Sequence, residues 1–209
     1  MRGLLLKDWY VARKNCRLYL AVIVITSVLF VFLETGAAYL LYPILFAGMI
    51  PIMILAVEEK TGWNDYSLTL PVTRRQIVSE KYIASLITVG GTCLFLALLW
   101  LVRLLVLGGD AYALARLPAQ LLCYGVLIPA VSLPPMLRLG VEKGRAVTMA
   151  VAVAVALVIV MLSMRADEIG QPDIAARMGW HIPVLALIAA AVFALSWLLS
   201  IWLYEKREL

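Results

Sequence analysis

Apolar residues are arranged along this chain in six long runs that contain no Asp, Glu, Lys, Arg or His. The runs extend over residues 18–33, 35–57, 82–102, 117–137, 146–164 and 182–204. A helix that crosses a bilayer needs about 20 predominantly apolar residues, with a range of about 17–25. The pattern therefore predicts an all-α, polytopic membrane protein with six transmembrane helices, at about residues 18–34, 37–60, 74–106, 117–137, 146–164 and 182–204.

The composition points the same way. Hydrophobic residues make up 64% of the chain and charged residues 15%, whereas soluble domains have about 45–50% and about 25%. This balance excludes a soluble enzyme. The polar segments between the runs are too short to build a second core, so we interpret residues 1–209 as a single transmembrane domain.

Lys and Arg are distributed unevenly between the segments that connect the runs. Fourteen lie in the N-terminal segment, the second and fourth loops and the C-terminal segment, and four lie in the remaining loops. Short loops rich in Lys and Arg stay in the cytoplasm. The bias predicts that both termini are cytoplasmic. Because the basic residues are scattered among loops, they indicate membrane orientation rather than binding of nucleic acid.

The first 17 residues precede the first run and have the pattern of a helix lying in the membrane interface. One stripe at helical spacing contains Leu5, Trp9, Ala12 and Cys16. Lys7 and Lys14 fall on the opposite side, where cations meet lipid phosphates. Such a helix either anchors the chain or acts as an elbow that transmits movement into the first span. The sequence leaves both interpretations open.

The longest loop on the predicted cytoplasmic side covers residues 58–81 and contains several helix signals. Gly62 suits the left-handed conformation that ends a helix, and Asp65 or its neighbour Asn64 can cap a new turn. That turn must finish before Pro71. Thr73 followed by Gln76 forms a capping-box pattern, which predicts a further helix leading into the third span.

These signals isolate a small helix between Gly62 and Pro71, with aromatic and apolar residues flanked by charges. The apolar members are Trp63, Tyr66, Leu68 and Leu70, and the charged members are Glu58, Glu59, Arg74 and Arg75. An apolar centre with a charged rim is typical of a docking surface. The alternative is a turn packed on the protein's own loops or on lipid headgroups, and composition does not separate the two.

Inside the predicted spans, the sequence offers mechanical features rather than chemistry. The six runs lack the ionisable residues that mark ion-coupled carriers. His181 is the only histidine, and Cys16, Cys93 and Cys123 have no metal-ligand spacing, so we expect neither a metal site nor catalysis. Prolines within the second and fourth spans predict helix kinks at Pro51, Pro129 and Pro134.

Three motifs carry a resemblance to a known family. They are Leu4-Leu5-Leu6-Lys7-Asp8-Trp9, Glu58-Glu59-Lys60-Thr61-Gly62-Trp63, and Leu70-Pro71-Val72-Thr73-Arg74-Arg75 followed by Lys81-Tyr82. With six spans around them, these motifs resemble the permease subunits of ABC type-2 exporters, in particular the small bacterial members that export peptides or amphiphiles.

The resemblance implies a place in the bacterial cytoplasmic membrane and a set of partners. Two permease copies would pair, with contacts near the first and fifth spans. Each would bind a separate cytoplasmic ATPase, which holds ATP and Mg²⁺. Residues 62–71 would form the coupling helix seated in that ATPase, with Glu58, Glu59, Arg74 and Arg75 as its ionic rim. The cargo would be hydrophobic or amphipathic, including peptide toxins or antimicrobial peptides.

The chain itself has no GxxxxGK[ST] phosphate loop, so we expect ATP hydrolysis in another polypeptide and no enzyme activity here. The alternative function is a non-transporting membrane sensor or assembly protein whose cytoplasmic loop docks a different soluble partner. Composition does not distinguish it from an exporter.

Overall fold

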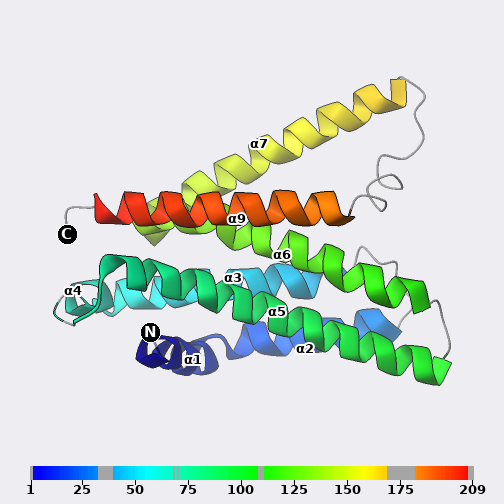
Figure 1. The fold of residues 1–209 in the computed structure, drawn as a ribbon, viewed down its shortest axis with the longest axis horizontal. Helices are drawn as coiled ribbons and strands as arrows, with labels where there is room; N and C mark the ends of the chain where they lie inside the picture. The colour runs from blue at the N-terminus through cyan, green and yellow to red at the C-terminus, as the bar shows by residue number, and fades with distance from the viewer. Residues whose placement is uncertain are drawn as a thin grey trace.

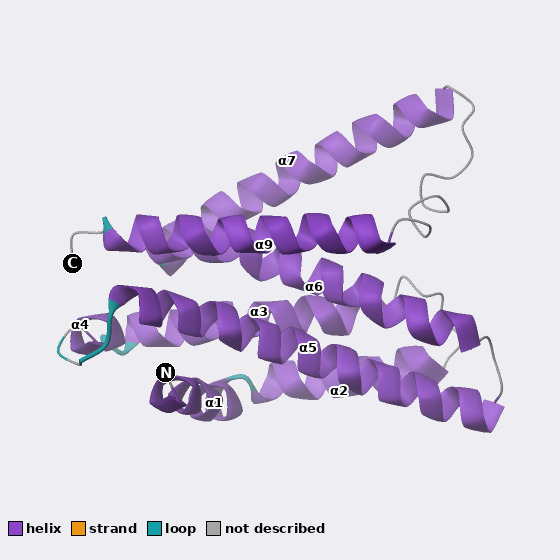
Figure 2. Ribbon diagram, viewed as in Figure 1, coloured by secondary structure: helices purple, strands orange, loops and turns teal. Residues whose placement is uncertain are grey.

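A computed structural model of the chain describes residues 2–32, 40–67, 69, 71–107, 111–168 and 182–206, and these residues form helices and no strand (Figure 2). The all-α prediction is confirmed for this part of the chain. The helices are α1 (Arg2–Asn15), α2 (Arg17–Phe32), α3 (Leu41–Lys60), α4 (Trp63–Ser67), α5 (Arg74–Leu107), α6 (Ala111–Leu139), α7 (Val141–Glu168) and α9 (Ile182–Glu205).

The long helices run along the longest axis of the molecule, and the short ones gather at one end (Figure 1). Helix α1, helix α4 and the C-terminal end of α9 all lie at this end, which we call the α4 end. Helix α6 is central, because it packs against α3, α5, α7 and α9. Helix α7 diverges from α9 as it runs away from the α4 end.

Four helices of the described residues are long and apolar enough to cross a membrane: Leu41–Lys60, Arg74–Val106, Ala119–Leu139 and Pro183–Glu205. They overlap the second, third, fourth and sixth predicted spans. The first predicted span, 18–34, falls on α2, and the part of this helix with described side chains, Arg17–Leu29, is apolar but shorter than a span. The fifth, 146–164, falls on α7, and the side chains of its second half lie outside the described residues. Six spans therefore stay a prediction.

Glycines let the central helices approach one another closely. A Cβ atom at Gly125 of α6 would lie 2.6 Å from side-chain atoms of both Ile44 and Val89, and one at Gly48 of α3 would lie 3.1 Å from Ile128. Small residues at such crossings are typical of membrane helices, where packing rather than water exclusion holds helices together. The core is thus centred where α3, α5 and α6 meet.

A buried hydrogen-bond network joins α5, α6 and α9. The Tyr82 hydroxyl lies 2.7 Å from both Ser196 Oγ and Ser200 Oγ, and Ser196 Oγ donates to the Ala130 carbonyl oxygen at 2.5 Å. The Ser196 bond satisfies the Ala130 carbonyl, which has no helical N–H partner because Pro134, four residues later, lacks one. Helices α3 and α6 continue through Pro51, Pro129 and Pro134, all of which are buried, and kinks at these prolines stay a prediction.

Local signals determine the connection from α3 to α5. Gly62 has φ of +68° and follows the last turn of α3. Helix α4 starts at Trp63, two residues before Asp65, since the Tyr66 amide already donates to the Gly62 carbonyl at 3.3 Å. The capping box is present: Gln76 N donates to Thr73 Oγ1 at 3.3 Å, and Thr73 N donates to Gln76 Oε1 at 3.1 Å.

Candidate functional site

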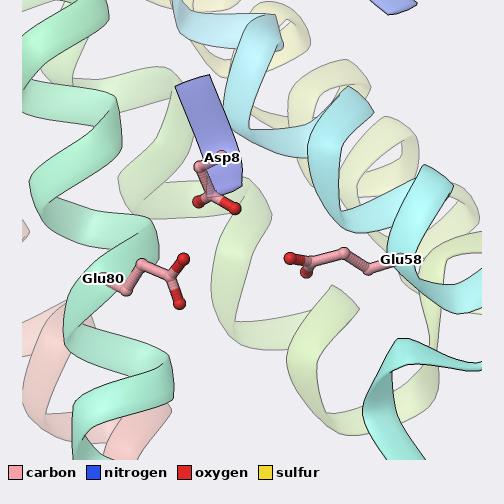
Figure 3. A group of neighbouring side chains, drawn as sticks. All are labelled: Asp8, Glu58 and Glu80. Atoms are coloured by element: carbon pink, nitrogen blue, oxygen red, sulfur yellow. The ribbon is translucent and has the colours of Figure 1, made fainter. Parts of the chain in front are cut away.

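Three buried carboxylates from three helices converge at the α4 end (Figure 3). Asp8 comes from α1, Glu58 from the last turn of α3 and Glu80 from the second turn of α5. None of the three is more than 3% exposed. One oxygen from each lies within 4.8 Å of the others. Such a concentration of negative charge away from water requires compensating cations.

Two lysines supply that compensation. Lys81 of α5, only 1% exposed, places Nζ 3.0 Å from Asp8 Oδ2 and 2.6 Å from Glu58 Oε1. Lys7 of α1 pairs with Glu58 and lies 3.1 Å from Asp8 Oδ1. We call Lys7, Asp8, Glu58, Glu80 and Lys81 the charge cluster. It joins the elements on both sides of α4 to the first helix of the chain.

Glu80 is the least satisfied member of the charge cluster. Its Oε1 is 3.6 Å from Lys7 Nζ and 3.8 Å from Lys81 Nζ, and neither of its carboxylate oxygens receives a hydrogen bond. Three carboxylates face two ammonium groups, so the ionised cluster carries one excess negative charge. The oxygens are close enough to share a cation, but the two lysine ammonium groups already occupy that role.

Helix α4 lies against this cluster through its first residue. Lys7 Nζ is 4.2 Å from the centroid of the Trp63 ring, a cation–π geometry. The Tyr66 ring lies 5.4 Å from the Trp63 ring, centroid to centroid, and its side chain is 56% exposed. Trp63 thus faces the protein and Tyr66 faces outward. Pro71 is exposed, whereas the Asp65 side chain, Leu68 and Leu70 lie outside the described residues.

The two arginines of the expected ionic rim contact the end of α9. Arg74 Nη1 donates to the Glu205 carbonyl oxygen at 3.0 Å, and Arg75 Nε donates to Glu205 Oε1 at 2.8 Å. A cation at the last carbonyls of a helix satisfies acceptors that lack partners within that helix. Arg75 nevertheless remains largely exposed. Both arginines stand at the start of α5, shortly after α4 in the chain, and have partners at the end of α9.

The two glutamates of the expected rim also have partners. Glu58 is buried in the charge cluster, so the structure does not place it on an exposed rim. Glu59 is more exposed, and its Oε2 accepts a hydrogen bond at 2.6 Å from the backbone N–H of Val141, the first residue of α7. A carboxylate at a helix N-terminus satisfies a free amide and interacts favourably with the helix dipole. Glu59 thereby ties α3 to α7.

The buried face of α1 agrees with the predicted stripe in its second half only. Ala12 and Cys16, which directly follows the helix, are buried as predicted, whereas Leu5 is half-buried, Trp9 is exposed, and Leu4 and Asp8 are buried instead. Lys7 enters the charge cluster instead of pointing to lipid phosphates, and Lys14 is exposed. Asp8 is not among the residues of the predicted stripe. Its pairing with Lys81 explains why it is buried.

A groove of about 760 Å³ opens beside α3, between α6, α7 and the start of α2. Methionines are frequent in its lining, and charged residues stand at its α4 end. The apolar lining includes Met49, Met53, Met136 and Met149, and the charged residues are Glu59, Lys60, Glu142 and Arg145. Methionine side chains are flexible and polarisable, which suits a surface that accepts ligands of varied shape.

A family model described as ABC-2 family transporter protein matches residues 3–205, nearly the whole chain. The chain belongs to the ABC-2 transporter family. The resemblance seen in the three motifs is therefore confirmed, and the protein is a multi-pass membrane permease. No curated protein and no solved structure gave a match.

In this ABC-2 permease, the motifs that carried the resemblance are the segments that meet at the charge cluster. The sequence interpretation selected Lys7 and Glu58 but missed Asp8, Glu80 and Lys81 as site residues. A usable signal was present: acid–base or acid–acid pairs at positions 7–8, 58–59 and 80–81 adjoin apolar stretches. Three such pairs supply both signs of charge, which is what a buried ionic joint requires.

Proposed function

We propose that this permease is the transmembrane subunit of an ATP-driven exporter and that α4, within residues 62–71, is the coupling helix that docks a separate ATPase. The observation that carries the proposal is the position of α4. In a chain of the ABC-2 family, a short helix with an exposed Tyr66 connects two apolar helices, α3 and α5, and packs on a buried ionic joint. ATP and Mg²⁺ bind to the partner ATPase in this scheme.

The proposed cargo is hydrophobic or amphipathic, such as peptide toxins or antimicrobial peptides. The methionine-lined groove supports this class, because its apolar wall accepts an acyl chain or an apolar peptide face. Lys60 and Arg145 at one end of the groove suit the polar part of such a molecule. Cargo of this kind needs no ionisable residue in the middle of the spans.

The proposed assembly is a pair of identical permeases in the bacterial cytoplasmic membrane, with both termini cytoplasmic. Helix α7 exposes Val147, Met149, Val151 and Val153, and α2 exposes Leu18, Val24, Ile25 and Leu29. A second copy seated on these faces closes the groove from the side. A Val153→Cys variant should form disulfide-linked dimers in membranes, whereas Leu187→Cys, equally apolar and on α9, should not. If Leu187→Cys forms disulfide-linked dimers and Val153→Cys does not, the two copies do not pair through α7.

ATPase docking is tested by measuring whether an ATPase copurifies with the permease from its native membranes. Trp63→Ala and Tyr66→Ala should lose the ATPase while still inserting into the membrane. Tyr10→Ala is the matched control, because Tyr10 is 61% exposed on α1 and Tyr66 is 56% exposed on α4. If the ATPase copurifies with Trp63→Ala and Tyr66→Ala as it does with Tyr10→Ala, α4 is not the docking element.

A further inference from the structure

Lys7 is shared between the charge cluster and helix α4. Its ammonium nitrogen pairs with Glu58, lies 3.1 Å from Asp8 Oδ1 and 3.6 Å from Glu80 Oε1, and lies 4.2 Å from the centroid of the Trp63 ring. The three carboxylates that surround this nitrogen come from three helices and point toward one another (Figure 3). In the described part of the chain, Lys7 connects this group directly to α4.

Helix α4 depends on such a connection for its position. It has five residues, Trp63–Ser67, and isolated helices this short are unstable in water. It follows Gly62, whose φ of +68° and open surroundings place a flexible residue at its start. Side-chain contacts must therefore hold α4 on the bundle. Ser67 at its end is buried, and Trp63 at its start contacts Lys7.

We infer that Lys7 is a positioning residue that fixes α4 on the bundle: the three carboxylates hold its ammonium group, and this group in turn holds the Trp63 ring. The inference rests on the proposed function in one respect, namely that α4 is the element moved by an ATPase. Movement of α4 then acts on α1, α3 and α5 together, because the ammonium group of one side chain forms ion pairs with carboxylates on all three helices.

Lys81 provides the contrast within the same cluster. It binds Asp8 and Glu58 as closely as Lys7 does, but it is fully buried on α5. Loss of Lys81 or Glu80 changes the charge balance of the cluster. Loss of Lys7 also removes the cation from the Trp63 ring. A cation–π contact of this kind corresponds to an equilibrium shift of about 3- to 30-fold, so α4 should become measurably more mobile.

The test measures the position of α4 in the full-length permease in lipid vesicles, with spin labels at Thr69→Cys beside α4 and Lys14→Cys on α1. Both positions are exposed, and the three native cysteines are buried. Lys7→Met should broaden the distribution of label distances at least twofold. Glu80→Gln should leave the distribution as narrow as in the unmodified permease. Lys7→Arg should also give the narrow distribution, since arginine supplies both the charge and a cation for the ring.

A second variant covers the case in which Lys7→Met does not fold. Trp63→Leu leaves the charge cluster intact and removes only the ring, and it should broaden the distribution as Lys7→Met does. The inference is overturned if Trp63→Leu leaves the distribution as narrow as in the unmodified permease, or if Glu80→Gln broadens it equally. Binding of the ATPase is not needed for this measurement, so a permease that fails to copurify with an ATPase but shows these changes refutes the proposed function alone.

Discussion

Glu58 and Glu59 are consecutive residues, yet they bind opposite sides of the bundle. Glu58 Oε1 lies 2.6 Å from Lys81 Nζ on α5, whereas Glu59 Oε2 accepts a hydrogen bond at 2.6 Å from Val141 N at the start of α7. Both stand in the last turn of α3, directly before α4. The end of α3 is therefore fixed to α1 and α5 by one carboxylate and to α7 by the next.

Removing the Glu59 carboxylate should loosen α7. Glu59→Ala leaves the Val141 amide without its acceptor, and the loss of a comparable helix cap costs about 1 kcal/mol. We expect a melting temperature about 2–4 °C lower in detergent. Lys60→Ala, one residue later and exposed, is the control and should change the melting temperature little. If the two substitutions change the melting temperature equally, the hydrogen bond from Val141 N to Glu59 does not contribute to stability.

Gly140 and Gly62 allow backbone strain to be separated from side-chain crowding. Both have positive φ, +83° and +68°. A Cβ atom at Gly140 would lie 2.7 Å from Glu59 Oε1, whereas one at Gly62 meets nothing within 4 Å. Gly62→Ala should cost only the backbone strain, about 1–2 kcal/mol. Gly140→Ala should lower the melting temperature further, and combining it with Glu59→Ala should remove the additional loss. A larger effect at Gly62 contradicts this account.

Neutralising Glu80 and neutralising Lys81 should affect the stability of the permease differently: the first should not lower the melting temperature, and the second should. Glu80→Gln brings the charge cluster to two carboxylates and two ammonium groups, and it removes a carboxylate that receives no hydrogen bond. We expect an unchanged or higher melting temperature. Lys81→Met leaves Asp8 and Glu58 short of a partner, and breaking buried pairs costs about 3–5 kcal/mol. The prediction fails if Glu80→Gln destabilises the permease as much as Lys81→Met.

The central crossing of α6 with α3 and α5 should tolerate no side chain at Gly125. Gly125→Ala places a methyl group 2.6 Å from Ile44 and Val89, and overpacking of this kind costs about 1–3 kcal/mol. Gly91→Ala is the control, because its Cβ meets nothing within 4 Å and alanine favours a helix interior. Gly91→Ala should keep or raise the melting temperature. If Gly125→Ala leaves the melting temperature unchanged, the helices at this crossing are packed less closely than the Gly125 contacts indicate.

Local features of the fold could be predicted from the sequence, since the signals that produce them are close along the chain. The uncharged runs indicated the long helices. Gly62 indicated a left-handed residue, and Thr73 with Gln76 indicated a capping box, both of which are present. The start of α4 was placed two residues late, because the Tyr66–Gly62 bond forms the first turn without Asp65 as a cap.

The charge cluster could not be predicted in the same way. Asp8 and Lys81 are separated by 73 positions, and Lys7 and Glu58 by 51. Charges that adjoin apolar runs are ordinarily solvated, and this assumption assigned Lys7 to lipid phosphates and Glu58 to an exposed rim. Helix periodicity identifies which residues share a face, but not which acid on another helix meets them. The pairing partners therefore required the three-dimensional structure.

The orientation of the permease follows from the charge bias and is open to a direct test. Impermeant maleimide should label Lys14→Cys and Thr69→Cys only after cells are permeabilised, and it should label Asp110→Cys, in a predicted outer loop, in intact cells. Native thiols add little background: all three cysteines are buried, and burial raises the pKa of the Cys16 thiol. Because α1 and α4 lie at the same end of the bundle, Lys14→Cys and Thr69→Cys must respond alike. Labelling of both in intact cells would place α4 outside, beyond the reach of an ATPase, and would refute the proposed coupling role.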